Sequence, residues 1–137
     1  MEKQKNYYMS DEDFNNFLES IGGLESCYKS KKVISRGYFE IENGWLGLVK
    51  ELIGELISRG WDRKICQCKQ KYGILRFYIL TGTDPIFKKI SEYESISLSV
   101  CEKTGGEGTL RKDLSWVMTL CEEEYVKITR QINGGIQ

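Results

Sequence analysis

The residues whose spacing comes closest to a known chemical site lie near the C-terminus. Cys101 and Thr104 are three residues apart, and so are Cys121 and Glu124. A zinc knuckle, which is a small structural zinc site, has two ligands at this spacing on one turn and two more on a second turn. Here only two of the four positions are cysteines, and two thiolates alone cannot complete a tetrahedral zinc site. The spacing therefore predicts a degenerate zinc knuckle, in which we expect neither zinc nor another cofactor.

The chain contains no histidine. It therefore lacks the commonest general base, the commonest nitrogen ligand of zinc, and every serine or cysteine dyad that depends on imidazole. Acidic residues are plentiful, but no pair has the spacing of a hydrolytic site, and the run from Glu122 to Glu124 is expected at the start of a helix. The glycines from Gly105 to Gly108 lack the lysine of a phosphate-binding loop. We expect a protein that is not an enzyme; a carboxylate hydrolase, the remaining alternative, would require a divalent metal.

The remaining cysteines do not indicate redox chemistry. Cys66 and Cys68 are two residues apart on a predicted strand, so both side chains face the same way, and we expect them in the core. Redox pairs use a C-x-x-C turn instead. The five cysteines are odd in number and irregularly spaced, which does not predict a disulfide framework.

Composition limits the partners of the protein. The 137 residues suit one domain, and 20 basic side chains balance 20 acidic ones, so no net charge attracts nucleic acid or an anionic membrane. No apolar run approaches the roughly 20 residues that cross a bilayer. The first ten residues are polar, unlike a signal peptide. We expect a cytoplasmic protein without a membrane partner.

The patterning predicts an α+β fold: a small antiparallel sheet of three to four strands packed against amphipathic helices, followed by the degenerate knuckle. Ser10 begins a helix over 11–21, and apolar residues at helical spacing between Trp45 and Ile57 predict the clearest helix. The other expected elements are strands at 65–69, 74–80 and 96–101, a helix over 84–94, an apolar run at 114–120 and a helix over 121–131. Gly73 is expected at a positive φ in a hairpin turn. Trp45 and Trp116 are expected in the core.

Several short motifs resemble a family of small phage and prophage proteins. They are Gly44-Trp45, Lys69-Gln-Lys-Tyr-Gly-Ile-Leu-Arg-Phe-Tyr78, Cys101 with Gly105, Gly108-Thr-Leu-Arg111, Trp116 and Thr119-Leu-Cys121. The family pattern has a second cysteine where this chain has Thr104 and a histidine where it has Glu124, so the resemblance implies that zinc binding is lost. It also implies a family-like core at 43–125, preceded by a variable N-terminal helical extension at 1–42 within one domain, 1–137.

The resemblance favours a protein that binds and inhibits or modulates a host protein, such as a component of bacterial antiviral defence like a CRISPR effector, in the host cytoplasm. Trp61, which follows Gly60, and Tyr28 are the expected contact residues, because interfaces favour large aromatic side chains.

The alternative is a nucleic-acid-binding module derived from a zinc knuckle that has lost its metal. It would use Lys69, Lys71, Arg76 and Arg111, with tyrosines near the hairpin stacking on bases. Phosphate contacts would weaken steeply with salt, whereas an apolar protein interface would not. A homodimer through exposed hairpin edges is a further expectation.

Overall fold

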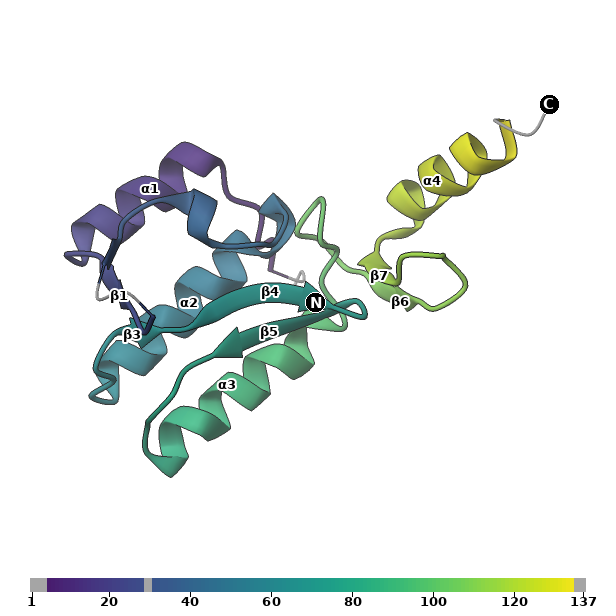
Figure 1. Cartoon of the computed structure of the whole chain (residues 1–137). Helices are drawn as coiled ribbons and strands as arrows, with labels where there is room; N and C mark the ends of the chain where they lie inside the picture. Colours follow the sequence, from purple (N-terminus) through teal and green to yellow (C-terminus); the bar gives the residue numbers. More distant parts are fainter. Residues whose placement is uncertain (1–4, 29–30, 135–137) are drawn as a thin grey trace.

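The fold is α+β, as predicted (Figure 1). The computed structural model describes residues 5–28 and 31–134. In chain order the elements are α1 (Asp11–Ser20), β1 (Leu24–Ser26), β2 (Lys32–Val33), two 3₁₀ turns (Arg36–Tyr38 and Asn43–Trp45), α2 (Leu46–Ser58), β3 (Lys64–Ile65), β4 (Gln67–Lys71), β5 (Ile74–Tyr78), α3 (Asp84–Ser97), β6 (Thr109–Arg111), β7 (Met118–Leu120) and α4 (Glu122–Gly134). No helix in this described part of the chain is long and apolar enough to span a bilayer.

Helix α2 is the centre of the main core. Its apolar residues recur at helical spacing and are fully buried except for Ile57, which is partly buried, and this confirms the predicted helix. The indole N–H of Trp45, just before the helix, donates to the carbonyl of Val100 at 2.8 Å, so this tryptophan is also a core residue as expected. Helix α1 packs on α2 with Phe14 and Leu18, and Ser10 caps it by accepting the N–H of Asp13 at 3.1 Å.

Residues of the N-terminal segment pack in this core. Strand β1 pairs antiparallel with β2 and parallel with β3, giving the order β2-β1-β3. The guanidinium of Arg36 donates to the carbonyls of Phe39 and Ile41 and pairs with Asp11, which fixes a segment that has little apolar periodicity of its own. Residues of this segment, among them Leu24 and Val33, belong to the same hydrophobic cluster as α2.

The strands do not form the single antiparallel sheet that we expected. They are divided into one mixed three-stranded sheet and two hairpins, β4-β5 and β6-β7. The predicted strand at 65–69 is interrupted at Cys66, so that β3 pairs with β1 while β4 pairs with β5. Strand β3 pairs with β1, which is far away in the chain, and the pattern of residues within a strand does not identify such a partner.

Strands β4 and β5 form the predicted hairpin, with Lys69 opposite Arg76. Tyr72 and Gly73 have φ values of 54° and 79°, which is typical of a tight two-residue hairpin turn. The free edge of β5 is covered by α3, because Ser97 Oγ accepts the N–H of Leu75 at 3.0 Å and Glu94 accepts that of Phe77 at 3.1 Å.

The other edge of the hairpin is also engaged. The carbonyl of Cys68 in β4 accepts the N–H of Glu40 at 2.9 Å. At these positions both edges of the β4-β5 hairpin are hydrogen-bonded within the protein. The homodimer was expected to form through exposed hairpin edges. The homodimer stays a prediction without this physical basis.

The strand predicted at 96–101 is wrong. Helix α3 continues to Ser97, and Val100 makes only an isolated bridge to Glu107. Ile96 and Leu98 are partly exposed, whereas Ser97 is fully buried against β5. Alternating apolar residues resembled a strand, but the contact between α3 and β5 favours the helix here.

The C-terminal lobe, defined here as β6, β7 and α4, extends away from the body of the molecule (Figure 1). It has a small hydrophobic cluster of its own, formed by Cys101, Leu114 and Leu120 with partly buried neighbours on α4. The helix predicted at 121–131 and the strand-like end of the run at 114–120 are both present, as α4 and β7.

Candidate functional site

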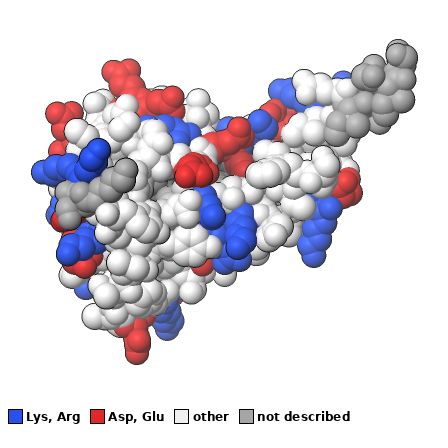
Figure 2. Space-filling model, viewed as in Figure 1, with Lys and Arg blue, Asp and Glu red and all other residues white. Residues whose placement is uncertain are grey.

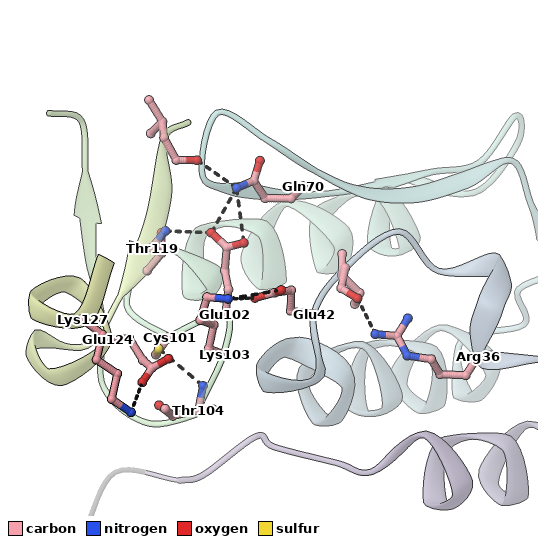
Figure 3. Close-up of polar contacts among 12 residues, drawn as sticks. Arg36, Glu42, Gln70, Cys101, Glu102, Lys103, Thr104, Thr119, Glu124 and Lys127 are labelled. Atoms are coloured by element: carbon pink, nitrogen blue, oxygen red, sulfur yellow. Dashed lines mark hydrogen bonds and ion pairs between the residues drawn. The ribbon is translucent and has the colours of Figure 1, made fainter. Parts of the chain in front are cut away.

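Three of the four positions of the predicted degenerate knuckle are joined by hydrogen bonds. The backbone N–H of Thr104 donates to the sulfur of Cys101 at 3.4 Å, and its hydroxyl donates to the sulfur of Cys121 at 3.8 Å. The carboxylate of Glu124 pairs with Lys127 at 3.0 Å (Figure 3). Thr104 therefore joins the two sulfurs by hydrogen bonds, and Glu124 has a cationic partner of its own.

The sulfur of Cys101 is surrounded by hydrogen-bond donors. Burial by itself raises the pKa of this thiol, but hydrogen bonds from Thr104 and from the backbone N–H groups of Cys121 and Lys103 outweigh burial and place the pKa below its usual value. Within the described residues, no three cysteine, histidine, aspartate or glutamate side chains are grouped to hold a metal ion.

Trp61 and Trp116 have the opposite environments to those that we expected. Trp61, predicted as an exposed anchor, is 5 % exposed and packs on Phe77 with ring centroids 5.8 Å apart. The left-handed backbone at Gly60 and Arg63 folds this segment back onto the core. Tyr28, the other predicted contact residue, is exposed.

Trp116, predicted to be buried, is 69 % exposed. It lies in the connection between β6 and β7, a hairpin whose strands are too short to cover it. The Lys112-Asp113 pair and Ser115 just before it are a polar signal that would have indicated an exposed loop.

A second exposed aromatic residue lies beside Trp116. Tyr72, at the turn of the β4-β5 hairpin, is 71 % exposed. Together they line a surface groove of about 450 Å³, whose other lining residues are Lys69, Gln70, Lys71, Ser115 and Val117. We call this the aromatic groove. Sequence reasoning missed it because its two sides are more than forty positions apart in the chain.

Close contacts between the two hairpins fix the sides of the aromatic groove. The Thr119 hydroxyl donates to the carbonyl of Gly73 at 2.8 Å, and Gln70 Nε2 donates to the carbonyl of Val117 at 2.9 Å. A Cβ atom at Gly73 would lie 2.4 Å from Leu110 Cδ1 and displace that side chain, and the φ of 79° would strain any other residue here, which favours glycine. These contacts join the two backbone segments that carry Tyr72 and Trp116.

Behind the groove lies a buried carboxylate. Glu102 is 2 % exposed and accepts hydrogen bonds from the N–H of Thr119 at 2.7 Å and from Gln70 Nε2 at 3.1 Å (Figure 3). Burial raises its pKa to about 7, against the lowering effect of these bonds. Glu102 also lines a second pocket, of about 540 Å³, which shares Trp116 with the aromatic groove and includes Glu40 and Glu42.

The predicted nucleic-acid residues are only partly brought together. Lys69 lies opposite Arg76 in the ladder, so both project from the outer face of the hairpin, and Lys71 lies on the same face. Figure 2 shows basic and acidic side chains interspersed over the visible face of the molecule. Arg76 lies 3.7 Å from Glu94 of α3. Arg111 stands apart on the C-terminal lobe.

The guanidinium of Arg111 is engaged within its own lobe. It pairs with Glu122 at 3.2 Å, donates to the carbonyl of Leu120 and lies 4.3 Å from the ring centroid of Tyr125. These contacts stabilise the start of α4 and leave Arg111 outside the candidate surface.

Compared with protein-family models, with curated proteins and with solved structures, the chain matches none of them. The candidate site is therefore assigned from geometry alone.

Proposed function

We propose that the protein is a non-enzymatic binding protein that docks on a host protein through the aromatic groove. The observation that carries this proposal is the pair of large aromatic side chains, Tyr72 and Trp116, each about 70 % exposed on one rigid groove. Tryptophan and tyrosine dominate the energetic centres of protein interfaces. Leaving this apolar surface in water is unfavourable, and a partner that covers it gains that free energy.

The charges around the groove favour a protein over a nucleic acid. Lys69 and Lys71 line the groove, and the adjoining pocket, which shares Lys69 and Trp116 with it, is also lined by Glu40 and Glu42. Mixed charges beside an aromatic centre are typical of the polar rim of a protein interface. Carboxylates so close to the groove would repel a phosphate backbone, and the chain as a whole has no net positive charge.

The motif resemblance to phage proteins supports a target in the bacterial host. A component of antiviral defence, such as a CRISPR effector, is the target that we propose on this ground. The second candidate function, binding of single-stranded nucleic acid, is favoured by one observation: Lys69, Lys71 and Arg76 share the outer face of the hairpin next to Tyr72.

A pull-down with matched variants tests the proposal. Tagged wild-type protein, Trp116→Ala, Tyr72→Ala and Tyr28→Ala are each incubated with nuclease-treated bacterial lysate. We expect a stoichiometric host protein on the wild type and on Tyr28→Ala, whose tyrosine is equally exposed but outside the groove. Loss of an interface anchor costs about 2 kcal/mol or more, so recovery falls roughly thirtyfold for Trp116→Ala. Equal recovery on Trp116→Ala contradicts the assignment of the groove.

The second candidate is tested with an oligothymidylate. Trp116 is the exposed tryptophan, so its fluorescence reports on bases that stack in the groove. We expect no quenching at about 50 mM salt. Strong quenching that disappears by about 200 mM salt would replace the protein-binding proposal with nucleic-acid binding.

A further inference from the structure

Two thiols lie next to each other at the junction of β1 and β3. These strands are parallel, with Ser26 opposite Ile65, and the residues that follow are Cys27 and Cys66. The backbone N–H of Cys27 donates to the carbonyl of Ile65 at 3.0 Å. The parallel ladder therefore continues to the two cysteines and holds them side by side.

Residues directly opposite each other in such a ladder direct their side chains to the same face of the sheet, so the two thiols lie on one face. Neighbouring strands are about 4.8 Å apart. Disulfides join residues whose Cα atoms are about 4.4 to 6.8 Å apart. Both residues are free thiols here. The strand pairing thus places them within the range that a disulfide requires.

A pocket lies beside this pair of cysteines. It has a volume of about 640 Å³ and is lined by Cys66 and by Ser26 and Tyr28, the two neighbours of Cys27. Lys31 and Lys32 also line it and outnumber the single carboxylate, Glu40. The pocket therefore favours a ligand that carries negative charge.

We infer that Cys27 and Cys66 are an oxidation site, which a low-molecular-weight disulfide that carries carboxylates, such as glutathione disulfide, converts into a reversible intramolecular disulfide. This inference is independent of the proposed docking function, because neither cysteine lines the aromatic groove.

The reaction has two steps. The thiolate of Cys27, the more exposed of the two cysteines, attacks one sulfur of glutathione disulfide, and one glutathione leaves as its S–S bond breaks. The sulfur of Cys66 then attacks the sulfur of Cys27, and the second glutathione leaves. The leaving thiolates take up the protons that the two cysteines lose. Two protein thiols are thereby oxidised to one disulfide, and one glutathione disulfide is reduced to two thiols.

The burial of the two sulfurs agrees with Cys27 reacting first and Cys66 second. Cys66 is buried, and burial raises its pKa, so it is not the sulfur that attacks first; in the second step its proton passes to the departing glutathione thiolate as its sulfur attacks that of Cys27. The resulting bond would join β1 covalently to β3 and restrict the unfolded chain.

The test exposes the reduced full-length chain to glutathione disulfide, blocks the remaining thiols with N-ethylmaleimide and measures the intact mass. We expect the wild type to lose two hydrogen atoms and two alkylation sites. Proteolysis should give a peptide pair that links Cys27 to Cys66, and fragmentation between Cys66 and Cys68 identifies the bonded sulfur. Oxidation should also raise the thermal unfolding midpoint.

Two variants make the result decisive. Cys27→Ser should lose both the linked species and the shift in unfolding midpoint, whereas Cys121→Ser, a change at a similarly half-buried cysteine, should keep both. The inference is overturned if the wild type remains fully alkylated, if glutathione stays attached to Cys27, or if the bond joins another pair. Circular dichroism of each reduced variant verifies that it is folded.

Discussion

The carboxylate of Glu102 is almost completely buried and accepts hydrogen bonds from two other elements, Gln70 of β4 and Thr119 of β7. Through Gln70, whose amide also donates to the carbonyl of Val117, it supports the loop that carries Trp116. The hydrogen bonds compensate only part of the cost of burying the charge, since the pKa of Glu102 is raised from 4.5 to about 7. The residue thus positions the groove at a cost in stability at neutral pH.

This raised pKa predicts how stability changes with pH. Between pH 4.5 and about 7 the folded state holds a proton on Glu102 that the unfolded state has lost. The contribution of Glu102 to the free energy of unfolding therefore falls by roughly 3 kcal/mol as pH rises through this window. Above the window it is constant. Urea denaturation at several pH values, on the wild type and on Glu102→Gln, measures the difference. Identical pH dependence in both proteins would contradict the prediction.

Trp61 is buried and Trp116 is exposed, so removing the two side chains should change stability by very different amounts. Trp61→Ala should lower the free energy of unfolding by about 3 to 5 kcal/mol, because it leaves a cavity beside Phe77. Trp116→Ala should change it by no more than about 0.5 kcal/mol, because the side chain is mostly in water. Urea denaturation of both variants gives the comparison, and a larger loss for Trp116→Ala would show that the burial assignment is wrong.

At the scale of elements, the two hairpins depend on one glycine for their contact. Gly73 has a φ of 79° and lies against Leu110 of β6, so the turn of one hairpin touches the other directly. A side chain at this position would both strain the turn and push the hairpins apart. The relative position of Tyr72 and Trp116 depends on this contact.

Gly73→Ala should therefore destabilise the protein by about 1 kcal/mol or more. Gly54→Ala is the matched control, since Gly54 lies on the exposed side of α2 with no atom within 4 Å of the position of a new Cβ. This control should increase stability by about 0.5 to 1 kcal/mol. Thermal or urea unfolding measures both variants, and an equal gain in both would refute the close contact at Gly73.

At the scale of the whole molecule, the protein consists of a large core around α2 and a much smaller cluster in the C-terminal lobe. The lobe meets the body at the knuckle, where Glu102 N–H donates to the carbonyl of Thr119 at 2.9 Å and Gly44 N–H donates to the carbonyl of Glu102 at 2.7 Å. Helix α4 projects beyond this junction (Figure 1). Local unfolding should therefore begin in α4.

Hydrogen exchange with mass spectrometry tests this division. Amides of α4 should exchange much faster than those of α2, because the described side chains of α4 are at most half-buried while the stripe of α2 is fully buried. Peptides from both helices are compared in one time course on the intact chain. Equal protection of α4 and α2 would show that the small cluster holds the helix as firmly as the main core does.

The sequence by itself determined the elements whose signals are local. The helix at α2 follows from its apolar period, the cap of α1 from Ser10, and the β4-β5 turn from Gly73, because each depends on residues within a few positions of one another. The cluster of Cys101, Thr104 and Cys121 also followed from spacing alone.

The tertiary structure decided what depends on distant segments. It alone placed β1 beside β3, extended α3 through Ser97, buried Trp61 and exposed Trp116 next to Tyr72. In each case the residues nearby in the sequence are compatible with two different environments. Burial and hydrogen bonding against residues far away in the chain determine which of the two is adopted. The candidate site is of this second kind, because a groove between two hairpins exists only once both have packed together.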